Sequence, residues 1–194
     1  MPVKIFISYS SVDRAEALAV RRLLTNRGCT VWLDVFDIRV AADLKRELGE
    51  GIGYARQVGF DTILERGVAA AESLPTDVVY AGMSLGAMPA QKLAQTRAGA
   101  KGAVLLHAAI PPSEFGGAWP SEVPLQIHLM EEDEFALEGD LDAARELDET
   151  VEGAELFLYP GDRHLFTDRS VSDYDENAAS VVKQRVIAFL DGID

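Results

Sequence analysis

A serine flanked by glycines stands where an apolar segment gives way to a helix-forming one. The pentapeptide GMSLG at residues 82–86 follows the apolar segment VVYA at residues 78–81. A sharp turn between a strand and a helix exposes a nucleophilic serine, and glycines two positions away leave room for the neighbouring backbone. The pattern therefore predicts that Ser84 is the nucleophile of an acyl-transfer reaction.

An acyl-transfer serine needs a histidine to accept its proton and a carboxylate to orient that histidine. Asp133 comes three residues after the apolar segment 125–130, and His164 comes just after the apolar segment 155–159. The chain order Ser, Asp, His resembles that of the α/β-hydrolases. We therefore predict that Ser84, Asp133 and His164 form a catalytic triad.

Other residues of the same types leave part of this assignment open. Three competitors for the role of Asp133 lie in the same connection: Glu132, Glu134 and Asp140. The short separation from the preceding strand favours Asp133 over them. The other two histidines, His107 and His128, lie within apolar segments and are expected to pack in the core, which leaves His164 as the candidate base.

The tetrahedral intermediate of acyl transfer also needs N–H donors for its oxyanion. One donor is expected from the backbone of Leu85, at the positive end of the helix that follows the nucleophile. The second is expected from the loop after the first strand, around Tyr9 and Ser10. That strand should lie beside the strand that leads to Ser84.

Short β-branched or aromatic segments alternate with longer amphipathic ones along the chain. The expected strands are residues 3–8, 30–33, 77–82, 102–107, 125–130 and 155–159. This alternation predicts a three-layer α/β sandwich with a doubly wound parallel sheet, flavodoxin-like or α/β-hydrolase-like. Right-handed crossovers favour the strand order 2-1-3-4-5-6, with chemistry at the carboxyl ends of the strands.

Helices are expected between these strands. The first begins near Asp13 and stops at Gly28, and another covers residues 62–74 with Asp61 as its N-cap. Further helices are expected near residues 141–149 and from about residue 173 onward.

Composition limits the class of partner. The 194 residues favour a single domain, and a net charge of −14 with a pI near 4.6 argues against nucleic acid and acidic membrane surfaces. The single cysteine, Cys29, cannot form an internal disulfide, and no apolar run is long enough for a secretory signal or a membrane span. We therefore expect a cytoplasmic protein that acts on a small molecule.

From about residue 51 to the end, the chain resembles the dienelactone hydrolase family of α/β-hydrolases. The resemblance is carried by GMSLG at 82–86, PLQIH at 124–128 and YPGDRHLF at 159–166. It implies a compact hydrolase for small esters or lactones that needs no cofactor and no metal. The best-known members use a cysteine nucleophile, whereas this chain has Ser84, which puts dienelactone itself in doubt as the substrate.

The first 50 or so residues resemble the opening of a TIR domain. The matching segments are KIFISYSSVDR at 4–14, VWLD at 31–34 and DIR at 37–39. TIR domains share the sheet order 2-1-3-4-5, so their first two strands could replace those of a hydrolase without a change of topology. We interpret the chain as one α/β domain over residues 1–194, a natural or engineered (de novo) chimera joined near residues 45–53.

The junction affects the expected function. The later half of a TIR domain, which supplies the glutamate of NAD-cleaving members, has no counterpart here, so NAD cleavage is disfavoured. The hydrolase in turn lacks its own first loop, so its ester or lactone hydrolysis is expected to be weak or residual. Two alternatives are a scaffold without catalysis and a TIR-like module that self-associates through its N-terminal region, with oligomers that vanish when the loop at residues 34–41 is altered. The sequence does not predict the oligomeric state.

Overall fold

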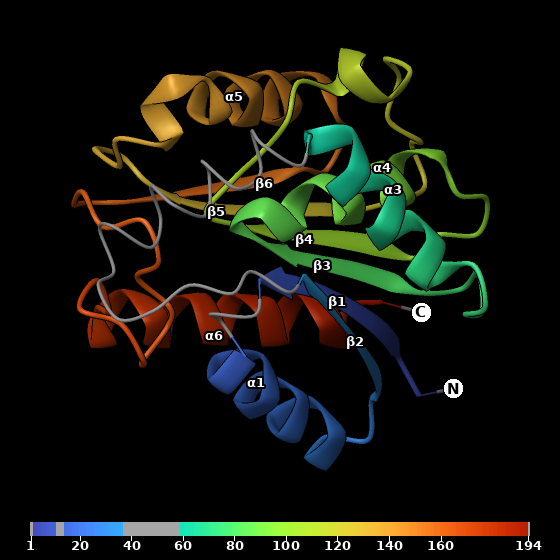
Figure 1. The fold of residues 1–194 in the computed structure, drawn as a ribbon, viewed down its shortest axis with the longest axis horizontal. Helices are drawn as coiled ribbons and strands as arrows, with labels where there is room; N and C mark the ends of the chain where they lie inside the picture. The colour runs from blue at the N-terminus through green and yellow to red at the C-terminus, as the bar shows by residue number, and fades with distance from the viewer. Residues whose placement is uncertain (1, 11–13, 37–58, 194) are drawn as a thin grey trace.

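The computed structural model describes residues 2–10, 14–36 and 59–193. Within these residues, six strands form one parallel sheet in the order β2-β1-β3-β4-β5-β6 (Figure 1). The strands are β1 (Lys4–Ser10), β2 (Thr30–Phe36), β3 (Val79–Met83), β4 (Gly102–Leu106), β5 (Leu125–Met130) and β6 (Glu155–Tyr159). The predicted α/β fold and strand order are confirmed.

Helices cover both faces of the sheet, as Figure 1 shows. On one face lie α3 (Phe60–Ala71), α4 (Ala87–Thr96) and α5 (Asp140–Thr150), and on the other lie α1 (Arg14–Asn26) and α6 (Glu176–Asp191). Successive strand side chains point to opposite faces, so the neighbours Val79 and Tyr80 belong to two different apolar cores. Because both faces are covered, β5 is buried along its whole length.

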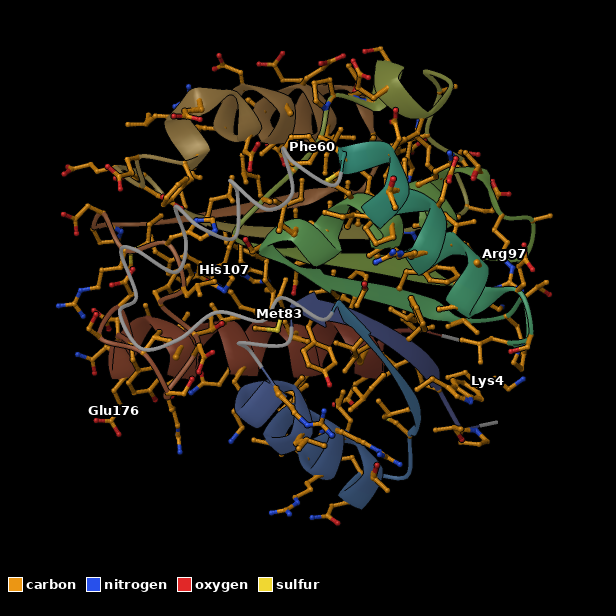
Figure 2. All side chains as sticks on the ribbon, in the orientation of Figure 1. Lys4, Phe60, Met83, Arg97, His107 and Glu176 are labelled. Atoms are coloured by element: carbon orange, nitrogen blue, oxygen red, sulfur yellow. The ribbon has the colours of Figure 1, made fainter. Side chains whose placement is uncertain are left out.

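The carboxyl ends of the central strands meet at one edge of the sheet. Ser8 of β1 pairs with Gly82, and Met83 pairs with Leu106 of β4, which in turn pairs with His128. Figure 2 shows Met83 and His107 at this edge, whereas Lys4 and Arg97 lie at the opposite edge. Loops that leave the strands at the first edge are therefore close enough for their side chains to meet.

Two expectations about helix starts are wrong. Asp61 is not an N-cap: α3 begins at Phe60, its N-cap is Gly59, and Asp61 lies in the first turn. The last helix begins at Glu176 rather than near residue 173, because the Asp175 side chain accepts hydrogen bonds from the N–H groups of Asn177 and Ala178, both at 3.0 Å.

Some predictions fall on residues outside the described ranges. The proposed junction at residues 45–53 is one, and most of the 34–41 loop is another, so the division into segments 1–50 and 51–194 stays a prediction. None of the helices in the described part is both long and apolar enough to cross a bilayer.

Candidate active site

The turn after β3 places Ser84 at the carboxyl edge in a left-handed backbone conformation, with φ of 51°. Gly82 and Gly86 make this turn possible. A Cβ atom on Gly82 would lie 2.3 Å from the carbonyl oxygen of Gly86, and a Cβ atom on Gly86 would lie 2.2 Å from the carbonyl oxygen of Ser8 in β1. Both contacts are with backbone, so only glycine fits at either position.

The loop after β5 holds Asp133 in a fixed position. Its side chain is 1% exposed. Its Oδ1 accepts a hydrogen bond from the backbone N–H of Phe135 at 3.0 Å, and its carbonyl accepts one from the N–H of Leu137 at 3.0 Å. One carboxylate oxygen is thus used for the turn, and the other, Oδ2, is left for a second partner.

The loop after β6 carries His164 and is tied to the loop after β5. The N–H of Glu132 donates to the carbonyl of Gly161 at 2.9 Å, and the N–H of Arg163 lies 3.3 Å from the sulfur of Met130. The His164 side chain is 5% exposed. The Phe135 ring packs beside its imidazole, with ring centroids 4.9 Å apart.

The structure brings Ser84, His164 and Asp133 into one hydrogen-bonded chain. His164 Nε2 lies 2.9 Å from Ser84 Oγ, and His164 Nδ1 lies 2.6 Å from Asp133 Oδ2. Since a carboxylate can only accept, the proton of this bond lies on Nδ1, and in the neutral tautomer that this selects, Nε2 is free to accept from the serine hydroxyl. In this arrangement Ser84 can lose its proton to His164 as it attacks an electrophilic carbon.

The alternative carboxylates lie differently. Glu132 and Glu134 are exposed, whereas Asp140, at the start of α5, is partly buried near His164 and Asp133. The pKa of Asp140 is raised to about 7, mainly by burial, with His164 opposing the shift and Asp133 adding to it. Asp133 is the one of these four whose carboxylate the structure places in hydrogen-bond contact with His164.

The predicted oxyanion residues surround the serine turn. Leu85 lies in the single helical turn η2 (Ser84–Gly86) that precedes α4, so its N–H comes too early in the helix to have an intrahelical acceptor. Tyr9 and Ser10 end β1, and the backbone of Ser8 and Tyr9 approaches Gly86. That the N–H groups of Leu85, Tyr9 and Ser10 bind the oxyanion remains a prediction. Among the described residues, no group of three or more His, Cys, Asp or Glu side chains is arranged to hold a metal ion.

Sequence reasoning missed His107 as a residue of this site. It was expected inside a strand, but β4 ends at Leu106, and His107 follows it with a left-handed φ of 69°. Its ring lies 5.9 Å from that of His164, centroid to centroid. A histidine at the carboxyl end of an apolar strand was the available signal. His128, by contrast, is buried inside β5 as expected.

Two family models match different parts of the chain. The model of the dienelactone hydrolase family matches residues 41–193, and the model of the TIR domain matches residues 5–60. Both resemblances predicted from the sequence are therefore confirmed. No curated protein is similar enough to this chain to count as a match.

Solved structures share the fold at low sequence identity. A dienelactone hydrolase-like promiscuous phosphotriesterase from metagenomic libraries has a TM-score of 0.69 at 15% identity, over 100% of this chain and 88% of its own. Esterase 2 of Thermogutta terrifontis, phosphonylated by cyclosarin, has a TM-score of 0.65 at 14% identity, over 96% of this chain and 80% of the esterase. The same esterase with propionate bound has a TM-score of 0.58 at 14% identity, over 97% of this chain and 84% of the esterase.

Proposed function

From the premise that the chain belongs to the dienelactone hydrolase family, we propose that it hydrolyses small esters or lactones through Ser84, His164 and Asp133. One observation carries the proposal: an unbroken hydrogen-bonded chain runs from the Ser84 hydroxyl through the His164 imidazole to the buried Asp133 carboxylate. The three side chains come from three separate loops, and acyl transfer by a serine requires this set of groups in contact.

In the first half of the proposed reaction, Ser84 Oγ attacks the carbonyl carbon and its proton passes to His164 Nε2. Asp133 keeps the proton of His164 on Nδ1 and stabilises the positive charge that the imidazole acquires. The protonated His164 then donates its Nε2 proton to the leaving alcohol oxygen as the ester C–O bond breaks. The acyl group stays on Ser84.

In the second half, His164 accepts a proton from a water molecule whose oxygen attacks the acyl carbon. The bond to Ser84 breaks, Oγ recovers the proton from Nε2, and the carboxylic acid leaves. A lactone follows the same path, except that its alcohol stays attached and the product is a single hydroxy acid. No cofactor takes part in this scheme.

We expect slow turnover, because one part of the oxyanion site lies in the TIR-like segment. The Leu85 N–H is one proposed donor, and the second would come from Tyr9 or Ser10 at the end of β1. Loss of one well-placed oxyanion donor costs on the order of 10²- to 10³-fold in turnover. A chain whose first loop resembles a TIR domain is therefore proposed to be a weak esterase.

The proposal is tested with a fluorophosphonate probe and with two substrates, p-nitrophenyl acetate and dihydrocoumarin. We expect labelling of Ser84 and hydrolysis that rises with protein concentration. Ser84→Ala should abolish labelling and remove the protein-dependent rate, because loss of a serine nucleophile costs on the order of 10⁶-fold in turnover. The esterase relative phosphonylated by cyclosarin makes a phosphonate a reasonable probe.

Ser121→Ala is the matched control, because this serine is exposed in a distant loop. It should keep both labelling and rate. If the wild-type protein is not labelled under conditions that label a control esterase, or if Ser84→Ala hydrolyses both substrates as fast as the wild type, the triad is a vestige and the chain is a scaffold without catalysis.

The TIR match over residues 5–60 favours a second candidate function, self-association through the N-terminal segment. Size-exclusion chromatography with light scattering, over a range of protein concentrations, tests this candidate. Oligomers that grow with concentration and vanish when residues 34–41 are replaced would support it. A monomer at every concentration would exclude it.

A further inference from the structure

His107 shares an uncommon backbone conformation with Ser84. In the described part of the chain, these two are the non-glycine residues with positive φ, at 69° and 51°. They directly follow the neighbouring strands β4 and β3 at the carboxyl edge, where Figure 2 shows His107. Such backbone conformations persist only where the surroundings hold them, and they cluster at functional sites. His107 therefore merits a role beyond core packing.

The His107 side chain contacts the loop that carries His164 at several points. Its Nε2 lies 2.8 Å from the hydroxyl of Thr167, and its ring meets that of Phe166 edge to face at 4.8 Å. Its ring centroid also lies 5.9 Å from that of His164. One fully buried side chain after β4 thus lies against the turn at residues 164–167, which contains His164.

The surroundings keep His107 uncharged. Burial lowers the pKa of His107 well below its usual range, and the nearby His164 and His128 lower it further. Its Nδ1 is buried and has no hydrogen-bond partner in the described part of the chain, so a protonated ring would leave an unpaired N–H. A neutral ring beside His164 does not oppose the positive charge that His164 acquires when it takes a proton.

Other bonds also hold the loop, and one of them lies beside His164: the N–H of Arg163 is 3.3 Å from the sulfur of Met130 in β5. The first residues of the loop are held by the bond from Glu132 N–H to the Gly161 carbonyl, and its end is held by the bond from Asp175 N–H to the Phe166 carbonyl, both at 2.9 Å. Directly after Phe166, the bond from His107 to Thr167 connects the loop through side chains to the residue that follows β4. Thr167 is three residues after His164 in the sequence.

We infer that His107 and Thr167 are positioning residues that fix the loop after β6, so that the His164 imidazole stays directed at Ser84. The inference rests on the proposed hydrolytic function. Neither residue is proposed to touch the substrate. Their effect on the reaction passes through the orientation of His164, and it depends on the Thr167 hydroxyl rather than on the volume of that side chain.

Thr167→Val removes the hydroxyl at nearly constant volume, and Thr167→Ser keeps it. Counting active sites with the fluorophosphonate probe separates turnover per site from loss of folded protein. We expect kcat per site to fall about tenfold in Thr167→Val with KM unchanged, since a small misplacement of a catalytic group lowers the rate by one to two orders of magnitude. Thr167→Ser should recover most of the rate.

Thr150→Val is the control for hydroxyl removal, because Thr150 is exposed at the end of α5. It should leave kcat unchanged. A Thr167→Val protein with wild-type kcat per site would overturn the inference. So would an equal loss in Thr167→Val and Thr167→Ser, because the hydroxyl would then not be the relevant group.

A second readout does not need activity. The chain has three histidines, so the proton on His164 Nδ1, held in a 2.6 Å bond to Asp133, should give a resolvable downfield NMR signal. We expect faster exchange of this proton with water in Thr167→Val than in the wild type. If the wild type hydrolyses nothing but the exchange rate still rises, the proposed function fails and the positioning role stands. Identical exchange in both proteins would overturn the positioning role.

Discussion

At the scale of single residues, the serine turn depends on two glycines that meet backbone on every side. Gly86 matters most for this chain, because the atoms it faces belong to β1, which comes from the TIR-like segment. The serine turn, in the part matched by the dienelactone hydrolase model, and the first strand therefore touch directly. The turn and the strand fit together only if residue 86 has no side chain.

Gly86→Ala should destabilise the protein by about 1–3 kcal/mol, the usual cost of forcing extra atoms into a packed site. The added Cβ would lie 2.2 Å from the Ser8 carbonyl oxygen, and no side-chain rotation can relieve a contact with backbone. Urea unfolding measures the change. Gly192→Ala is the control, because φ there is −88° and the added Cβ has ordinary contacts from 3.4 Å. Equal stability of the two variants would contradict the predicted clash.

At the scale of elements, the helices cover the faces of the sheet (Figure 1), and α4 also holds the loop that follows β4. The side chain of Gln91, buried in α4, donates to the carbonyl of Ile110 at 2.6 Å and accepts from its N–H at 2.9 Å. Gln95, one turn later, donates to the carbonyl of Pro112 at 2.8 Å. The helix that starts at the nucleophile turn thus also anchors the loop after β4.

The start of α6 holds the end of the loop after β6, because Asp175 is both the N-cap of α6 and a donor to the Phe166 carbonyl. Asp175→Ala removes two hydrogen bonds to the first turn of the helix, so we expect a loss of about 1 kcal/mol in the free energy of unfolding. Thermal or urea unfolding measures it. Glu152→Ala, which removes an exposed carboxylate in a loop, is the charge-matched control and should have little effect. A wild-type stability for Asp175→Ala would mean that the cap does not stabilise α6.

At the scale of the whole molecule, buried titratable groups make stability depend on pH. Burial lowers the pKa of His107 well below its usual range, and burial, together with Arg185, lowers the pKa of His128 to about 3. The unfolded chain protonates both below about pH 6.5, so stability falls as pH falls below that value. Asp140, whose pKa is raised to about 7 mainly by burial, has the opposite effect. Its contribution to the free energy of unfolding is complete below about pH 4 and is lost as the pH rises through 7.

Between pH 6.5 and 4.5, each of these groups changes the free energy of unfolding by about 1.4 kcal/mol per pH unit. On acidification, His107 and His128 lower it, whereas Asp140 raises it. We expect the free energy of unfolding to fall on acidification across this range. His128→Gln should flatten the slope by about that amount, and Asp140→Asn should steepen it by a similar amount. Urea unfolding at several pH values measures both. Unchanged slopes in the two variants would contradict the assigned protonation states.

The linear order of the chain was enough to predict the sheet order and the family resemblances, because strand alternation and the residues around the serine turn are local patterns. It also narrowed the site to Ser84, His164 and a few carboxylates. Local patterns failed at helix starts: Asp61 is a residue type that favours the N-cap, yet α3 begins at Phe60 with Gly59 as its N-cap.

Tertiary structure alone decided which groups meet. Several acidic residues share one connection, and only the closing of the loop after β5 directs the Asp133 carboxylate at His164 and leaves Glu132 and Glu134 exposed. Neither the left-handed backbone of His107 nor its contact with Thr167, 60 residues away, can be read from local sequence. The physical reason is that hydrogen bonds and burial depend on distances between segments far apart in the chain, and these distances exist only once the sheet has formed.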